Sequence, residues 1–236
     1  MKQSVSLWIA ALCLILCGAL LCGCSDKTGT ATSGGNADGT DPGVAYEKPV
    51  LEQDENLVAF SYDQAADLYT DTATGKTYRR APMCYEPVTL QTGYGEVDGA
   101  VLYRVANAEN LEFLSLEYTG MGNELFYCTD ITLPEADAFQ PKKALICRQD
   151  AITVSENEIV DVSLLETLLH TLKSGKQEEL PTEAENARRI KFVSDAYPAL
   201  YYSVRYFEDS NGNAFLRDPA SGRLVSVGTM LDGYVS

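Results

Sequence analysis

The residues best suited to covalent or proton-transfer chemistry are three cysteines and one histidine. Cys84, Cys128 and Cys147 follow the first apolar segment, and His170 is the sole histidine of the chain. A Cys–His dyad would supply a nucleophilic thiolate, but no motif around these residues supports one. The chain also lacks the Gly-x-Ser-x-Gly pattern of a serine triad, and these cysteines lack the Cys-x-x-Cys spacing of a zinc site. The sequence therefore predicts no catalytic residues, no metal site and no cofactor.

Carboxylates are numerous enough to provide acid–base chemistry. The chain has 34 Asp and Glu residues against 18 Lys and Arg residues, for a formal net charge of −16. Two close carboxylates would suffice for glycoside hydrolysis, but with so many acids any chosen pair has little meaning. A solvated acidic face is the simpler interpretation. The same balance argues against nucleic-acid binding, which takes clustered Lys and Arg to neutralise phosphates.

Tyrosine is the other abundant functional side chain, with 14 residues against a single Trp. Tyr197, Tyr201, Tyr202 and Tyr206 cluster beside Pro198 and form a candidate binding surface, because such rings bury much area at low entropic cost. The alternative is that they fill half-exposed sheet positions, which their β propensity favours.

The N-terminal residues predict a targeting segment. Lys2 is the only charged residue before Asp26, and residues 7–17 are an unbroken apolar run that continues over 19–22. So short a run behind a basic start is typical of a secretory signal peptide, since a spanning helix needs about 20 apolar residues. The stretch approaches that limit when it is counted to Gly23, so an uncleaved anchor helix is the alternative.

This segment ends in Leu21, Cys22, Gly23 and Cys24. These residues resemble the lipobox of bacterial lipoproteins, with an apolar residue at −3, a small one at −1 and the acceptor cysteine at +1, although Cys22 departs from the usual small residue at −2. The resemblance covers the signal region alone. It implies a signal peptide over 1–23, a diacylglycerol on the Cys24 thiol, and a protein anchored by lipid in the cell membrane that faces outside the cytoplasm.

The lipidated cysteine begins a predicted tether, residues 24–43. Residues 25–43 are mostly Ser, Thr, Gly, Ala and Asp, with no aromatic and no large aliphatic side chain. Such a segment cannot bury a core, and nineteen residues of this kind span on the order of 25 Å. Loss of Lys2 with the signal peptide would bring the net charge to −17. We expect that charge to keep the domain, residues 44–236, away from anionic head groups.

Export also permits a disulfide bond. Cys128 and Cys147 lie on neighbouring predicted strands and are the pair that we expect to bond if any does. The alternative is that Cys84, Cys128 and Cys147 are small buried hydrophobic residues in reduced form.

From residue 44 onward, the sequence predicts antiparallel hairpins and meanders. Short runs of Val, Tyr, Phe and Leu alternate with Gly, Asn, Asp and Pro. The predicted strands are 57–62, 85–91, 100–106, 111–118, 124–129, 144–148, 152–155, 189–194, 200–208, 214–217 and 223–227. Along 200–208, the even-numbered residues share one face and Tyr201, Ser203, Arg205 and Phe207 share the other.

Glycines mark the predicted turns. Asn211 and Gly212 predict a type I′ hairpin, in which both central residues have positive φ. The pattern Asp-x-Ala-Thr-Gly-Lys over 71–76 recurs as Asp-x-Ala-Ser-Gly-Arg over 218–223, and we expect both copies to be hairpin loops with Gly at positive φ and Asp accepting from turn amides. Residues 93–99 hold three glycines and are interpreted as a loop, not a dinucleotide site, because a strand and not a helix follows.

One helix is predicted over 164–173. Ser163 and Glu166 suggest a capping box, and Gly175 a left-handed stop. Five leucines form a stripe about 140° wide that should pack on a sheet, while His170 faces solvent on the opposite side.

The predicted fold class is therefore α+β, with a mostly antiparallel sheet and one amphipathic helix packed on it. Two related β units with a boundary near 156–162 would account for the repeated turn. The predicted function is a non-catalytic binding or interaction module for an unknown protein or envelope ligand. The alternatives are a carboxylate-dependent hydrolase of envelope glycans and a structural or inhibitory subunit that docks on a membrane complex through its acidic surface.

Overall fold

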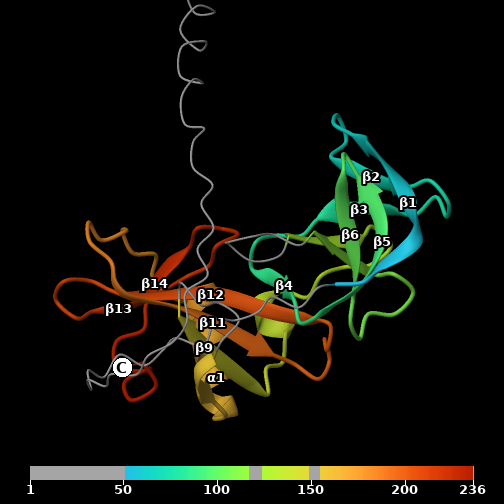
Figure 1. Cartoon of the computed structure of the whole chain (residues 1–236). Coiled ribbons are helices and arrows are strands. Elements are labelled where there is room, and N and C mark those ends of the chain that lie inside the picture. The colour runs from blue at the N-terminus through green and yellow to red at the C-terminus, as the bar shows by residue number, and fades with distance from the viewer. Residues whose placement is uncertain (1–50, 117–123, 149–154, 236) are drawn as a thin grey trace, which may run out of the picture. The chain divides into compact units, whose positions relative to one another are not determined.

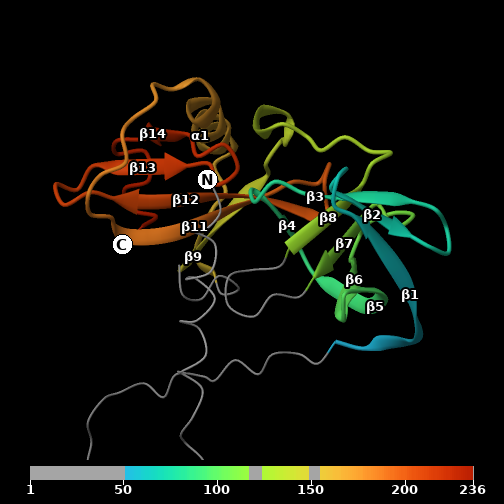
Figure 2. The same ribbon diagram turned by 90° about the horizontal axis from the view of Figure 1, so that it is seen from above.

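A computed structural model describes residues 51–116, 124–148 and 155–235, all of which belong to one compact unit, Lys48–Ser236 (Figures 1 and 2). The predicted signal peptide, Cys24, the tether and residues 152–154 of a predicted strand lie outside the described residues. Within these ranges the chain forms fourteen strands, one α-helix and one 3₁₀ helix. Seven strands close into a barrel, and seven others form an open sheet.

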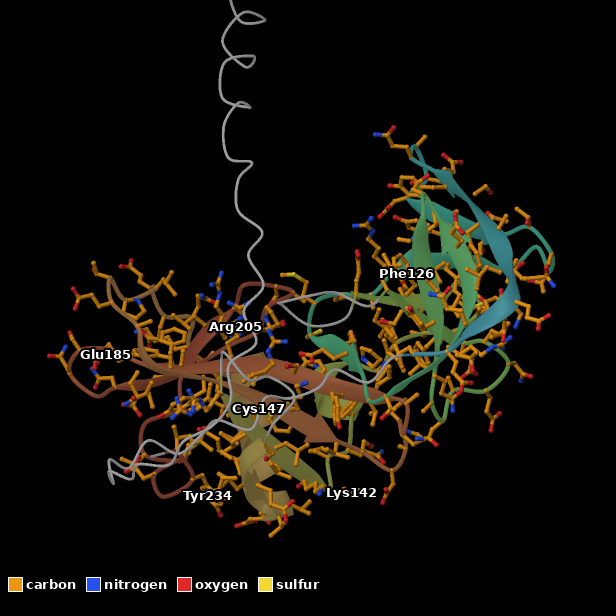
Figure 3. All side chains as sticks on the ribbon, in the orientation of Figure 1. Phe126, Lys142, Cys147, Glu185, Arg205 and Tyr234 are labelled. Carbon is orange, nitrogen blue, oxygen red and sulfur yellow. The ribbon has the colours of Figure 1, made fainter. Side chains whose placement is uncertain are left out.

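The barrel is built from the first part of the described chain, in the strand order β1-β2-β3-β8-β7-β6-β5. Neighbouring strands are antiparallel, except that β1 and β5 pair in parallel and so close the barrel. An aromatic core that includes Phe60, Tyr78 and Phe126 fills it, and Figure 3 labels Phe126 among the barrel strands. The strands are β1 (Gln53–Asp63), β2 (Leu68–Asp71), β3 (Thr77–Arg80), β5 (Leu90–Val97), β6 (Ala100–Val105), β7 (Phe113–Leu116) and β8 (Glu124–Cys128).

Gly93 and Gly95 lie within β5, so the prediction of a glycine-rich loop is wrong for them. A Cβ built on Gly95 would come within 2.4 Å of the Phe60 ring and 2.9 Å of the Val58 carbonyl oxygen. Glycine is needed there because β1 passes too close for any side chain. This close approach lets the Phe60 ring enter the barrel core.

The type I′ hairpin falls at a different place from the predicted one. Asp98 and Gly99 both have positive φ, 49° and 79°, and join β5 to β6 as a two-residue turn. At the predicted position only Gly212 has positive φ. There the Asp209 carboxylate accepts from the N–H groups of Asn211 and Asn213, which holds a longer loop.

The repeated turn motif is confirmed in both copies. The Gly75 and Gly222 N–H groups donate to the carbonyl oxygens of Asp71 and Asp218 at 2.8 and 2.9 Å, and both glycines have positive φ. Each Asp carboxylate also accepts from two N–H groups of its own turn. The first copy joins β2 to β3 in the barrel, and the second joins β13 to β14 in the open sheet.

The open sheet has the order β10-β9-β11-β12-β13-β14, and β4 pairs with part of β12. All its pairs are antiparallel. Leu200, Tyr202, Val204 and Tyr206 of β12 all point into one hydrophobic core, as the period of two predicts. The strands are β4 (Tyr85–Pro87), β9 (Lys143–Arg148), β10 (Ser155–Ile159), β11 (Glu185–Val193), β12 (Leu200–Glu208), β13 (Ala214–Arg217) and β14 (Leu224–Ser226). Barrel strands end at Cys128 and sheet strands resume at Lys143, whereas the sequence suggested a boundary near 156–162.

The helix α1 (Val162–Ser174) packs the predicted leucines into the core of this sheet, and the short 3₁₀ helix η1 (Ala136–Ala138) precedes β9. The N-cap of α1 is Asp161, whose carboxylate accepts from the Leu164 N–H, so the predicted capping box at Ser163 is wrong. Gly175 is extended and not left-handed. The Arg223 guanidinium instead donates to the carbonyl oxygens of Leu172 and Gly175 and so caps the C-terminus.

The predicted α+β class is wrong, because the described chain is mostly β and one of its two sheets is a closed barrel. The four-residue strands β2 and β3 were not predicted, because they are too short to show alternation. The prediction also merged β4 and β5 into one strand, although they belong to different sheets. Without these strands a closed barrel could not be recognised.

Candidate functional site

The four tyrosines singled out in the sequence do not form one exposed surface. Tyr202 and Tyr206 are buried in the sheet core, with 4% and 3% of their surface exposed. Tyr197 stacks on Phe139 with the ring centroids 5.5 Å apart. Tyr201 lies on the other face of β12, half-buried. The period of two separates Tyr201 from the others, and burial removes Tyr202 and Tyr206 from solvent.

The three cysteines of the described chain are free thiols, so Cys128 and Cys147, the pair considered for a disulfide, are not bonded. Cys128 lies on β8 of the barrel, where it is paired with Tyr78, whereas Cys147 lies on β9 of the open sheet. All three are buried. Burial raises the pKa of Cys84 to about 12 and also raises that of Cys147, which disfavours a reactive thiolate. His170 is exposed and its ring contacts Ser174, one turn along the helix.

Two acidic side chains are buried among the described residues, Asp71 and Glu86. Asp71 lies in the barrel, where the Tyr94 hydroxyl donates to it at 2.6 Å in addition to the turn amides. Glu86 lies on β4 of the open sheet. The described chain thus places no second buried carboxylate beside either one.

The face of the open sheet opposite α1 carries a row of cationic side chains that was not predicted from the sequence. Cross-strand register places Arg189 of β11 beside Arg205 of β12, and Arg205 beside Arg217 of β13. Figure 3 shows Arg205 on the side of β12 away from the helix. These three residues are here called the arginine row. Directly opposite residues have Cβ atoms about 5 Å apart, so the three side chains leave the sheet together.

Glu86 neutralises one end of this face. Its carboxylate accepts from the Arg189 guanidinium at 2.7 Å and from the Lys191 ammonium at 2.9 Å. Glu86 reaches these partners on β11 from β4, across the small Ser203 of β12. Burial alone would raise the pKa of Glu86, but Lys191 and Arg189 outweigh it and hold that pKa below its usual value. The carboxylate therefore stays ionised and balances part of the local charge.

Arg205 and Arg217 lie at the other end of the arginine row, where no carboxylate of the described residues pairs with them. Neither has an ion pair or a hydrogen-bond partner among the residues that the structure describes, and both are half-buried. Burial lowers the pKa of Arg205, and the guanidinium groups of Arg189 and Arg217 lower it further. Arginine nonetheless stays protonated. Two adjacent cations therefore lack an anion, in a chain whose net charge is −16.

An aromatic pair adjoins these two arginines. Phe207 and Phe215 are the next residues on the same face of β12 and β13, and register pairs them directly. Their rings stack with centroids 5.7 Å apart and planes inclined by 21°. Phe207 is buried and Phe215 is half-buried. We call these residues the phenylalanine pair. Cations and aromatic rings thus occupy successive positions on two adjacent strands.

Half of this site is predictable from the sequence. The period of two already placed Arg205 and Phe207 on one face of the strand 200–208. Applied to the strand 214–217, the same rule gives Phe215 and Arg217. What it cannot give is the register that brings the two strands into contact with like residues opposite each other.

Searches for a matching family model, a curated relative or a solved structure find none for this chain. The described residues hold no group of three or more His, Cys, Asp or Glu side chains that could bind a metal ion. Across the described ranges, no helix is both long and apolar enough to cross a membrane.

Proposed function

We propose that this protein is a lipid-anchored, extracytoplasmic binding module without catalytic activity, and that it contacts an anionic ligand through Arg205 and Arg217 of the arginine row. One observation carries the choice of surface: two adjacent, half-buried guanidinium groups have no anionic partner among the described residues. Like charges directly opposite each other on a sheet destabilise it. An anion bound between them would relieve that repulsion.

The chemistry of the two side chains favours a carboxylate or phosphate. Guanidinium groups offer planar, bidentate donors that match both anions. Hydrogen bonds to charged groups contribute about 1.5–3 kcal/mol each, and half-burial strengthens them by excluding water. Two such contacts are enough for a dissociation constant near 1 mM, which corresponds to about −4 kcal/mol. Larger affinities would need further contacts from the ligand.

The proposed membrane attachment depends on Cys24. Its thiol would carry the diacylglycerol, and two or more acyl chains anchor a protein stably where one chain does not. The tether of residues 25–43 would let the acidic domain stand off from the membrane. We expect Cys24→Ala to shift the protein from the membrane fraction to the soluble extracytoplasmic fraction. Full retention of that variant in membranes after a high-salt wash would contradict the anchor.

Anion binding is tested on the full chain in non-ionic detergent by thermal unfolding. At constant ionic strength, 50 mM inorganic phosphate should stabilise the protein by about 2 kcal/mol if the dissociation constant is near 1 mM. Arg205→Gln and Arg217→Gln should each abolish that stabilisation. The matched control is Arg79→Gln, since Arg79 is an exposed residue on β3 of the barrel.

The same variants separate a binding role from a structural one. In the absence of an anion, Arg217→Gln should leave the stability unchanged or raise it, because the substitution removes a like-charge contact with Arg205. If Arg217 had a structural role, its substitution would instead destabilise the protein. The proposed surface is refuted if phosphate stabilises Arg217→Gln as much as it stabilises the parent protein.

A further inference from the structure

The phenylalanine pair adds a second chemical requirement to the anionic surface. We propose that the ligand is a small amphipathic organic anion, in which an apolar group lies on the phenylalanine pair while a carboxylate or phosphate lies on Arg205 and Arg217. This inference rests on the proposed function, since it assigns the remainder of the ligand at the same surface.

The spacing of residues along a strand sets the distance between the anionic subsite, at Arg205 and Arg217, and the apolar subsite, at the phenylalanine pair. Arg205 and Phe207 are two residues apart on β12, as are Phe215 and Arg217 on β13. Two residues of a strand span about 6.6 Å. A ligand that reaches both subsites therefore holds the centres of its anionic group and its apolar group roughly 6 Å apart, as a carboxylate and a phenyl ring joined by two methylene groups do. A bare inorganic anion would fill the first subsite alone.

The aromatic rings are placed to receive an apolar group. Phe207 is 6% exposed and stacks on the more open Phe215 of the neighbouring strand. A planar or aliphatic group on Phe215 would remove apolar surface of both partners from water. Among the described residues of this face, the nearest acid to the arginine row is Glu86, which Arg189 and Lys191 already engage. The charge of Glu86 is thus already balanced by two cations.

A free small anion fits the surface better than a large polyanion. On this face of the described sheet, the two guanidinium groups that lack partners, those of Arg205 and Arg217, are both half-buried and do not project from the surface. A large polyanion would extend beyond these two cations over a chain whose net charge is −16.

The test compares three probes on the full chain in non-ionic detergent: 3-phenylpropionate, propionate and 3-phenylpropanol. The first carries both groups, the second only the anion and the third only the ring. Affinities follow from thermal stabilisation over a concentration series at constant ionic strength. We expect 3-phenylpropionate to bind about tenfold more tightly than propionate, and 3-phenylpropanol to give no stabilisation.

Two variants test whether the phenyl group of 3-phenylpropionate binds at the phenylalanine pair. Phe215→Ala should bring 3-phenylpropionate to the affinity of propionate while it leaves propionate binding intact. Tyr62→Ala is the matched control, since Tyr62 is an aromatic residue that is 40% exposed on the barrel. It should leave the tenfold preference unchanged.

The outcomes distinguish this inference from the function on which it rests. Equal binding of 3-phenylpropionate and propionate, with both lost in Arg217→Gln, overturns the apolar subsite and leaves anion binding in place. Binding of 3-phenylpropanol as tight as that of 3-phenylpropionate also overturns the inference, because the anion would then contribute nothing. If none of the probes and no inorganic phosphate stabilises the protein, the proposed function of this surface fails as well. The ligand comparison needs no variant, so it decides the question even if Phe215→Ala fails to fold.

Discussion

Substitution of Glu86 by Gln tests the electrostatic account of the open sheet. The change keeps the shape of the side chain and removes its charge. Lys191 and Arg189 then stay charged without a counter-ion, although their side chains are only 9% and 11% exposed. Removing one partner of a buried ion pair costs about 3–5 kcal/mol. For a protein of this size that loss lowers the melting temperature by roughly 6–20 °C.

Urea unfolding of the full chain, followed by circular dichroism at pH 7, measures the effect. Glu158→Gln is the matched control, because the Glu158 carboxylate also bonds a lysine, Lys143, at 3.0 Å, but on the surface, with its side chain 52% exposed. Exposed ion pairs contribute about 0–1 kcal/mol, so the control should unfold close to the parent. Double substitution Glu86→Gln with Lys191→Met should recover part of the loss, since it removes the stranded charge.

The difference in unfolding free energy between the parent protein and Glu86→Gln should change with pH in a defined direction. The pKa of Glu86 in the folded protein lies below its ordinary value of 4.5. Its ionised form therefore stabilises the fold fully above pH 4.5, and this stabilisation is lost as the pH falls through the lowered pKa. The parent should thus lose its advantage over Glu86→Gln on acidification below about pH 4.5. A Glu86→Gln protein within 0.5 kcal/mol of the parent at pH 7, or a difference that grows in acid, would refute the reasoning.

Two further substitutions test the packing of the barrel and the helix cap. Gly95→Ala should lower the free energy of unfolding by about 1–3 kcal/mol, because the added Cβ would meet the Phe60 ring at 2.4 Å. Adding Phe60→Leu should recover part of that loss. An unchanged urea midpoint for Gly95→Ala would contradict the observed closeness of β1 and β5. Asp161→Ala should lower the free energy of unfolding by about 1 kcal/mol because it removes the N-cap, whereas Ser163→Ala should lower it much less. The reverse order in urea unfolding would support the capping box at Ser163 that the sequence suggested.

Features that depend on near neighbours in the chain were predictable. Both copies of the Asp-x-Ala-Thr/Ser-Gly turn were predicted, because the carboxylate of the Asp and the positive φ of the Gly act within six residues. The alternation of β12 and the buried leucines of α1 follow from the period of each element. The helix cap was missed by two residues because Asp161 and Ser163 are both good N-caps and only the observed hydrogen bond distinguishes them.

Features that depend on which strands meet were decided by tertiary structure. Closure of the barrel comes from the parallel pairing of β1 with β5, and no local pattern in either strand marks it. Glu86 and Arg189 are 103 residues apart in the chain, yet their ion pair determines which arginines remain uncompensated. Arg205 and Arg217 become neighbours through the register of β12 with β13.

The sequence by itself therefore determined local geometry, a strongly acidic charge and the prediction of a lipidated N-terminus. Only the tertiary structure decided that two sheets form, that Tyr202 and Tyr206 enter a core while Tyr201 lies on the opposite face, and that a few of the scarce cations gather on one face. The physical reason is that side-chain periodicity is a property of a single strand, whereas register and charge compensation are properties of strands brought together from distant parts of the chain.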